Sequence, residues 1–177
     1  MKRLLITLGA ALALTAPLGV AALTSGAQAD VSNAGKLRIT EYGFNAVGVD
    51  KSSNRNEEFV RLSNPTSAPV DVTGWVLHDT YQNAAGDYGN RYTFRVDDLP
   101  AGSPFRSTEG RFVVPAGGQV YIYNGSGVDT TPTNNTAAIY RNFKHMWNNG
   151  GDTIYLRDTD GTVVARVTYS SYRVRVW

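Results

Sequence analysis

The sequence has 177 residues, of which 42% are hydrophobic and 18% charged, and it contains no cysteine. The lack of cysteine excludes disulfides, a lipid-modified cysteine and the usual cysteine-containing zinc sites. The formal net charge of +2 excludes the strong global field that gathers nucleic acid or an anionic membrane surface.

The N-terminus has the residue order of a secretory signal. Lys2 and Arg3 precede an apolar stretch over residues 4–23, and an Ala-Gln-Ala motif precedes Asp30. We predict a signal peptide over residues 1–29 that is cleaved before Asp30, and a secreted, extracellular product. The alternative is an uncleaved membrane anchor, since the apolar stretch is long enough to span a bilayer.

Removal of the signal peptide changes the net charge of the chain and limits the length of the folded domain. The remaining chain carries 15 basic and 15 acidic residues, so its net charge is zero and a global attraction to nucleic acid is not expected. We expect no membrane span after cleavage. A chain of this size can bury a core without disulfides. We therefore predict one domain over residues 37–177, after a short disordered lead over residues 30–36.

Short apolar runs that alternate with polar residues predict β-strands, and the segments between them are rich in glycine, asparagine and serine. The expected strands cover residues 37–42, 59–62, 70–77, 91–96, 112–114, 120–123, 152–157 and 162–168. The Asp-Thr-Asp-Gly turn at 158–161 predicts a hairpin between the last two strands. Segment 124–143 could be an ordered crossing between sheets or a mobile loop. No helical pattern follows the signal, so the fold class is all-β.

Segment 57–79 is the centre of this organisation. Two apolar runs flank the turn-forming sequence Asn-Pro-Thr-Ser-Ala-Pro, which predicts a β-hairpin. Gly74 lies inside the second run, and a strand glycine often marks a bulge or a close backbone approach. We predict that the hairpin buries the next residue, Trp75, in the core.

Several ordered motifs resemble the lamin-tail domain. They are E-F-V-R-L-S-N at 58–64, V-D-V-T-G-W-V-L at 70–77, Y-T-F at 92–94, P-A-G-G at 115–118 before V-Y-I-Y, and W-N-N-G-G-D at 147–152 before I-Y-L. The resemblance covers about residues 37–169. It implies an immunoglobulin-like antiparallel β-sandwich without catalytic residues, found in nuclear lamins and as an extracellular module in bacteria.

The sequence has few candidates for catalytic side chains, and we expect that the protein is not an enzyme. His78 and His145 have no G-x-S-x-G motif or cysteine nearby, as a hydrolase triad would need. We expect His78 to be half exposed at a strand end and His145 to pack on Trp147. Glu57 and Glu58 are strand neighbours that point to opposite faces, so we expect a structural role for them.

Counting strand reversals places loops 43–56 and 79–90 and the turn 158–161 at one end of the sandwich. That end would also hold Asp50. A calcium site is the only cofactor hypothesis there, because Ca²⁺ takes six to eight oxygen ligands. Its ligands would be Asp79, Asp87, Asp158 and Asp160. The alternative is that these aspartates are solvated turn residues selected for backbone geometry.

The aromatic residues suggest a binding surface, since flat rings suit sugars. We expect Trp75, Tyr121, Tyr123 and Tyr169 inside, and we expect Tyr81, Tyr88 and Trp147 on the surface as partner-binding residues. The sequence thus predicts a secreted, non-catalytic lamin-tail-like binding or structural module of the extracellular space or cell envelope. Its partner would be an unidentified protein or a cell-envelope glycan. The alternative is a carbohydrate-binding module of the cell envelope. An extracellular nuclease is disfavoured, because bacterial relatives tend to carry such chemistry on attached domains.

Overall fold

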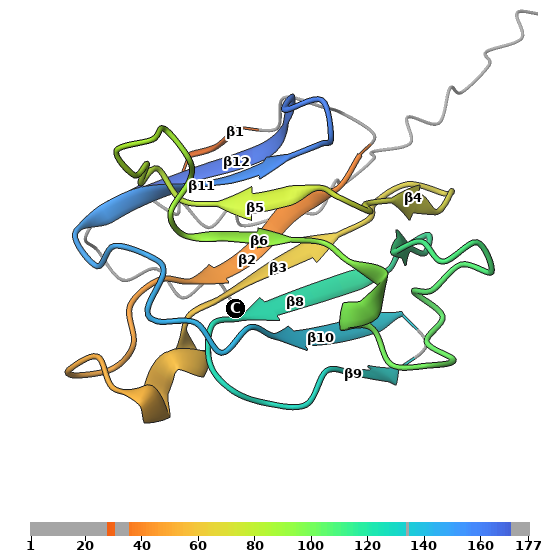
Figure 1. The fold of residues 1–177 in the computed structure, drawn as a ribbon, viewed down its shortest axis with the longest axis horizontal. Helices are drawn as coiled ribbons and strands as arrows, with labels where there is room; N and C mark the ends of the chain where they lie inside the picture. The colour runs from red at the N-terminus through yellow and green to blue at the C-terminus, as the bar shows by residue number, and fades with distance from the viewer. Residues whose placement is uncertain (1–27, 31–35, 134, 171–177) are drawn as a thin grey trace, which may run out of the picture.

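The computed structural model describes residues 28–30, 36–133 and 135–170, and these form mainly β-strands (Figure 1). The strands are β1 (Gln28–Asp30), β2 (Arg38–Gly43), β3 (Phe59–Ser63), β4 (Val70–Asp71), β5 (Val76–His78), β6 (Arg91–Thr93), β7 (Val113–Val114), β8 (Gln119–Tyr123), β9 (Thr130–Thr133), β10 (Thr136–Tyr140), β11 (Gly151–Arg157) and β12 (Val163–Ser170). Two short 3₁₀ helices are η1 (Ser52–Glu57) and η2 (Val96–Asp98). The predicted all-β class is confirmed.

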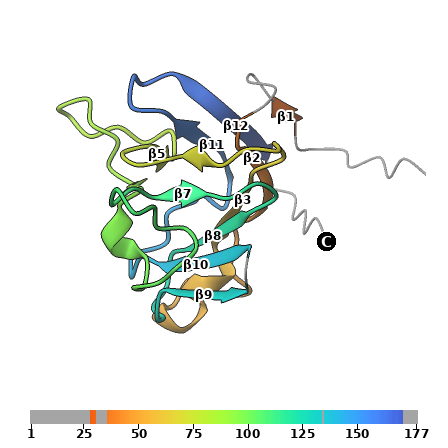
Figure 2. The same cartoon turned by 90° about the vertical axis from the view of Figure 1, so that its right-hand side faces the viewer.

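The strands form two five-stranded sheets with the orders β1-β12-β11-β5-β6 and β2-β3-β8-β10-β9, and β4 pairs with β7 as a two-stranded sheet. In Figure 1 the first sheet lies in the upper part of the view, and β8, β10 and β9 lie in the lower part. In Figure 2, β7 lies between β5 and β10. This arrangement is the expected immunoglobulin-like β-sandwich.

The core lies between the two five-stranded sheets because both turn their apolar side chains inward. Val60 and Leu62 of β3 and Ile122 of β8 belong to the same buried cluster as Ile154 and Leu156 of β11. The strands alternate between buried and half-buried residues, which is the period of a sheet with one covered face. Burial of these aliphatic side chains is the main force that holds the layers together.

Among the strand pairs that the structure describes, the predicted antiparallel arrangement has one exception, since β10 runs parallel to β8. The cause is β9, which pairs antiparallel with β10 on the other side and so provides the return path from β8. The described residues of segment 124–143 include β9 and β10, which lie in the same sheet as β8, so they do not form the expected crossing between sheets.

The predicted hairpin over residues 57–79 is wrong. β3 pairs with β2 and β8, whereas β4 pairs with β7 and β5 pairs with β6 and β11. The buried Asn64 helps to explain the path, because its Nδ2 lies 3.0 Å from the carbonyl oxygen of Val114 and 2.9 Å from that of Pro115. These bonds hold the end of β3 against another segment, and the chain then passes through β4 to β5 in the first sheet.

The prediction that Trp75 is buried is confirmed, since its exposed fraction is 7%. Gly74 does not form a bulge within a strand; it lies between β4 and β5 with a φ of 78°, in the left-handed region that favours glycine. A Cβ atom at Gly74 would lie 3.2 Å from Cγ2 of Thr159. The glycine therefore allows the bend before Trp75 to approach the turn between β11 and β12.

The predicted signal peptide lies mostly outside the described residues, which begin at Gln28. β1 pairs antiparallel with β12, and the predicted cleavage position before Asp30 falls inside β1. The predicted disordered lead covers residues 30–36. Its first residue, Asp30, lies in β1, and its last, Lys36, lies shortly before β2. Residues 31–35 lie outside the residues that the structure describes. Within the described ranges, no helix has the length and apolarity needed to cross a membrane.

Candidate functional site

A buried carboxylate, that of Glu58, organises one end of the sandwich. Glu58 directly precedes β3 and its exposed fraction is 0%. Its Oε2 accepts hydrogen bonds from Nδ2 of Asn124 at 2.7 Å and from the backbone N–H of Met146 at 2.8 Å and of Trp147 at 3.3 Å. Its Oε1 lies 2.9 Å from Nδ1 of His145. A buried carboxylate is tolerated when it is hydrogen-bonded in this way, and here it fixes the segment before β11.

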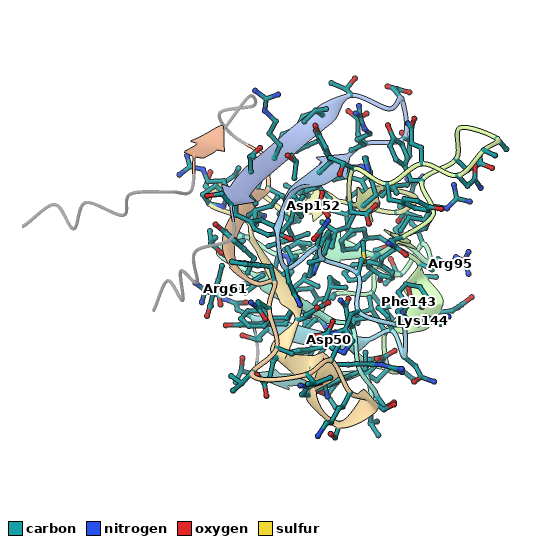
Figure 3. The ribbon with its side chains drawn as sticks, turned by 90° about the vertical axis from the view of Figure 1, so that its left-hand side faces the viewer. Asp50, Arg61, Arg95, Phe143, Lys144 and Asp152 are labelled. Atoms are coloured by element: carbon teal, nitrogen blue, oxygen red, sulfur yellow. The ribbon has the colours of Figure 1, made fainter. Side chains whose placement is uncertain are left out.

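Three loops meet above this network and enclose an open cavity of about 510 Å³, which we call the end pocket. Asp50 comes from the loop after β2, residues 79–81 and Asn90 come from the loop between β5 and β6, and residues 145–149 lead to Asp152 at the start of β11. In Figure 3 Asp50 and Asp152 lie one below the other in the middle of the view. The pocket thus joins segments that are distant in sequence.

The carboxylates of the end pocket are held by short hydrogen bonds. Asp152 Oδ1 accepts from the Thr80 hydroxyl at 2.5 Å and from the backbone N–H of Thr153 at 2.7 Å. The buried Asp79 accepts from the backbone N–H of Tyr81 at 2.9 Å and from Nδ2 of Asn90 at 2.7 Å. Each carboxylate therefore has a fixed orientation on the rigid strand ends.

Asp79 and Asp152 are close enough to affect each other. Burial raises the pKa of Asp79, the hydrogen bonds from Asn90 and Tyr81 oppose this effect, and the charge of Asp152 raises the pKa further. His145 is the one histidine that lines the pocket, and its Nδ1 lies 3.9 Å from Oδ1 of Asp50. The pocket is therefore predominantly acidic at neutral pH.

Two polar atoms beside the end pocket have no hydrogen-bond partner among the described residues. They are the indole Nε1 of Trp147 and the side-chain oxygen Oδ1 of Asn149. Trp147 is only 4% exposed, and both residues line the pocket. A buried donor without a partner costs about 1–3 kcal/mol. Both atoms have almost no solvent-accessible surface, so they are buried in the wall of the pocket.

The predicted grouping of Asp79, Asp87, Asp158 and Asp160 at one end is wrong. Asp152 contacts Thr80 at the start of β11, and Asp158 follows the end of this strand. At a rise of about 3.3 Å per residue, the two strand ends are about 20 Å apart. The count of reversals failed because the chain changes sheets after β3 and because β8 and β10 are parallel.

Instead, Asp158 closes the turn between β11 and β12. Its Oδ1 accepts from the backbone N–H of Asp160 at 3.1 Å and of Thr162 at 2.9 Å, and its Oδ2 lies 3.8 Å from Lys36 Nζ. In the part of the chain that the structure describes, no three histidine or acidic side chains are placed so that they could hold a metal ion. The turn-residue alternative therefore describes Asp158 better than the calcium hypothesis.

The predicted partner-binding residues have different environments. Tyr81 is 59% exposed and lines the end pocket, as expected for a surface residue. The prediction that Trp147 lies on the surface is wrong, because its ring is buried beneath the pocket. Tyr88 stacks on His78 with ring centroids 3.6 Å apart. The predicted half exposure of His78 is wrong as well, since its exposed fraction is 0%.

The prediction that Tyr121 and Tyr123 lie in the core is also wrong. In β8 the aliphatic residues Val120 and Ile122 face the core, so the tyrosines face outward and are half buried. Tyr123 lies opposite Phe59 of β3 and Tyr140 of β10, at centroid distances of 5.7 and 5.0 Å. The rings cover much of one another, so this strip is a packed outer surface.

Sequence reasoning missed Asn90, Asp152 and the internal role of Glu58. His145 was expected to pack on Trp147, but its Nδ1 contacts Glu58 and its Nε2 lies 3.2 Å from the carbonyl oxygen of Lys51. The available signal was the aspartate that ends the W-N-N-G-G-D motif, directly at the start of a strand. Pairing of that strand with β5 could not be inferred from the motif alone.

Comparison with known proteins gives one match at the level of families. No curated protein matches the chain. The model of the Lamin Tail Domain family matches residues 30–171, which is most of the sequence. This chain therefore belongs to the lamin tail domain family, a family of non-catalytic immunoglobulin-like domains.

Proposed function

We propose that this protein is a secreted, non-catalytic binding module of the extracellular space or cell envelope, and that its ligand site is the end pocket. One observation carries the proposal: three loops that are distant in sequence converge on a cavity lined by polar and aromatic side chains, among them Asp50, Asp152 and the exposed Tyr81. Loops on a rigid sandwich are frequent binding sites, and concave sites with a few convergent polar groups are the usual ligand sites.

The arrangement of His145 supports binding over catalysis. Its Nδ1 is bonded to Glu58, and its Nε2 lies 3.2 Å from the carbonyl oxygen of Lys51. A general base needs a ring nitrogen that can reach the substrate proton. With both nitrogens engaged, this imidazole serves to position the loop.

Secretion is supported by the signal-like order of residues 1–29. Expression in a secreting host followed by intact-mass measurement of the released protein tests this part. A mass that begins at Asp30 is expected. A mass that still includes residues 1–29, or protein found only in the membrane fraction, would overturn the assignment to the extracellular space.

Binding is tested with the chain from Asp30 onward, immobilised and exposed to a panel of cell-envelope polysaccharides and extracellular proteins. Asp50→Asn and Asp152→Asn remove charges from the end pocket, and Asp160→Asn is the matched control at the opposite end of β11. We expect retention of a panel member by the wild type and the control, and at least about tenfold weaker retention by the pocket variants.

Two results of this panel would overturn the proposal. One is that the wild type retains neither a polysaccharide nor a protein of the panel. The other is that the pocket variants retain the ligand as well as the control variant does. The panel also separates the two kinds of partner. Retention of polysaccharide alone would favour the carbohydrate-binding alternative, and retention of a protein alone would favour a protein partner.

A further inference from the structure

The loop between β5 and β6 carries a segment that projects from the first sheet. In Figure 1 the loop extends beyond the end of β5, and we call residues 81–89 its flap. Residues 82–87 are exposed, and Oδ1 of Asn83 accepts hydrogen bonds from the backbone N–H groups of Ala85 at 3.0 Å and Asp87 at 2.9 Å. The tip of the flap is therefore closed by its own hydrogen bonds.

Tyr88 attaches the flap to the sheet. It is half buried, whereas its neighbours Asp87 and Gly89 are exposed. The Tyr88 ring stacks on the imidazole of His78 with ring centroids 3.6 Å apart, and the guanidinium carbon of Arg157 lies 5.8 Å from the Tyr88 centroid. Since His78 is fully buried, the flap covers this histidine as long as Tyr88 remains in place.

The base of the loop has separate attachments. The Thr80 hydroxyl donates to Oδ1 of Asp152, and Nδ2 of Asn90 donates to Oδ2 of Asp79. The flap can therefore leave His78 while β5 and β6 stay paired. Tyr81, at the edge of the end pocket, packs on Gly89 at the other end of the flap, where an added Cβ would lie 2.6 Å from the ring. Movement of the flap thus moves this edge of the pocket.

The covered imidazole cannot take a second proton in its present surroundings. Its Nδ1 lies 2.6 Å from the carbonyl oxygen of Asp79, and its Nε2 accepts a hydrogen bond from Nε of Arg157 at 3.0 Å. A proton on Nε2 would face the N–H group of Arg157, and the charged ring would be buried without an acceptor on that side. Displacement of Tyr88 exposes the ring to water, which removes this cost.

Several charged or titratable groups face His78. On β11 they are Tyr155, Arg157 and Asp152; Asp79 follows His78 directly, Tyr88 belongs to the flap, and the exposed Arg91 lies opposite on β6. Burial lowers the pKa of His78, and the charge of Arg157 lowers it further. The hydrogen bond to the Asp79 carbonyl and the charge of Asp152 act in the opposite direction without reversing the shift.

We propose that the flap is an acid-released cover: it is seated on the sheet through Tyr88 while His78 is neutral, and protonation of His78 displaces it and widens the end pocket at Tyr81. The device does not depend on a ligand in the pocket, so it goes beyond the proposed function. It assigns to the buried histidine a role that the pocket itself does not require.

The sign follows from the exposure of His78 in the two states. With the flap displaced, the ring is in water and its pKa returns toward the ordinary value of 6.5, whereas with the flap seated the pKa is lower. The ratio of displaced to seated flap is therefore lowest above pH 6.5. Below that value it rises by at most about tenfold per pH unit, until the pH reaches the pKa of the seated state. Burial raises the pKa of Asp79, so exposure of this carboxylate would give the opposite dependence on pH.

The test follows the flap and the histidine in one sample. The ¹⁵N-labelled protein released from a secreting host is studied by NMR between about pH 7.5 and 5, the range in which histidine titrates. The amide signals of Gly86 and Gly89 report flap motion through relaxation dispersion and ¹⁵N relaxation. The Hε1 signal of His78 reports its protonation, and His145→Gln assigns it because the chain has two histidines. The Leu156 amide in β11 reports the fold of the sheet.

We expect an ordered flap at the upper end of the pH range and increasing flap exchange below pH 6.5, along the same curve as the His78 titration. The Leu156 signal should not change. Tyr88→Ala should give a mobile flap over the whole range. The matched control is Tyr81→Ala, which removes the exposed ring of the same flap and should keep the dependence on pH. In His78→Gln the side chain cannot take a proton, and flap motion should not depend on pH.

Four results would overturn the proposal. They are a flap as ordered at the lower end of the pH range as at the upper end, a dependence on pH that persists in His78→Gln, an ordered flap in Tyr88→Ala, and loss of the Leu156 signal together with the flap signals, which is general unfolding. If His78→Gln fails to fold, the wild type still decides, because a flap curve with a midpoint different from that of His78 contradicts the coupling. None of these results depends on whether the end pocket binds a ligand.

Discussion

The carboxylate of Glu58 accepts a 2.8 Å hydrogen bond from the backbone N–H of Met146, 88 residues later in the chain. The same oxygen accepts from the next N–H, that of Trp147. A residue at the start of β3 therefore fixes the segment that supplies Trp147 and Asn149 to the end pocket. One buried carboxylate thus links β3 to a segment that lines the candidate site.

Glu58→Gln is expected to lower the free energy of unfolding by about 1.5–3 kcal/mol, the range for a hydrogen bond to a charged group. An amide has one acceptor oxygen and a donor group that faces the N–H groups of residues 146 and 147. Urea denaturation measures the change. The matched control is Glu109→Gln on an exposed side chain, for which a change within about 0.5 kcal/mol is expected. Equal stabilities of the two variants would show that the network contributes little.

Trp75→Ala is expected to cost about 3–5 kcal/mol, because it removes a large buried aromatic side chain from the core. Domains of this kind have a total stability of about 5–15 kcal/mol, and no disulfide is present in reserve. Denaturant midpoints provide the measurement, with Tyr81→Ala as the exposed aromatic control. A loss below about 1 kcal/mol would contradict the position of Trp75 in the core.

The sequence was sufficient to predict the family and most of the strands, although not β1, β9 and β10, because these features depend on local patterns. The alternation in Phe59–Ser63 and Gln119–Tyr123 defines two strands, and the observed bounds agree closely with the expected ones. The Asp-Gly turn after Arg157 forms the predicted hairpin between β11 and β12. Each of these features is decided by residues within a few positions of one another.

Features that depend on pairing between distant segments were predicted less well. Segment 57–79 has the pattern of a hairpin, but the bonds of Asn64 to residues 114 and 115 belong to another part of the chain. The alternation of side chains in β8 predicts a strand, but it does not indicate which of the two faces lies in the core. The larger side chains, Tyr121 and Tyr123, were therefore wrongly expected inside. The end pocket combines three loops, so its composition follows only from the pairing of β5 with β11.

Asn64→Asp is expected to destabilise the domain more than Asn64→Ala does. Nδ2 of Asn64 lies within 3.0 Å of the carbonyl oxygens of Ala68, Val114 and Pro115, so an aspartate would place a carboxylate oxygen against them. Loss of the donor leaves buried carbonyls unsatisfied at about 1–3 kcal/mol, and a buried charge adds to this cost. Thermal melts of the two variants test the order, with exposed Asn135→Asp as control. The reverse order would contradict the donor role of this amide.

The last prediction concerns pH and the buried His78. Nδ1 of His78 lies 2.6 Å from the carbonyl oxygen of Asp79, and Nε2 accepts a hydrogen bond from Nε of Arg157 at 3.0 Å. A carbonyl can only accept and a guanidinium can only donate, so the ring is neutral with its proton on Nδ1. Protonation of Nε2 would break the bond from Arg157 and place two positive charges side by side. Burial lowers the pKa of His78 below the ordinary value of 6.5, and the charge of Arg157 lowers it further.

Because the unfolded chain takes up this proton more readily than the folded one, the contribution of His78 to stability is complete above pH 6.5 and is lost as the pH falls toward the folded pKa. Within that window the free energy of unfolding should decrease by about 1.4 kcal/mol per pH unit. The raised pKa of Asp79 acts in the opposite direction as the pH falls, so the comparison between variants is more informative than the wild-type slope alone.

Urea unfolding of the wild type and of His78→Gln between about pH 7.5 and 5 measures this contribution. The glutamine variant should be less stable at the upper end of the range, and the difference between it and the wild type should shrink as the pH falls. His145→Gln removes the other histidine and should keep the wild-type dependence on pH that arises from His78. If the free-energy difference between the wild type and His78→Gln is constant over this range, His78 takes up its proton equally well in both states. The neutral, hydrogen-bonded ring would then not be the source of any pH dependence.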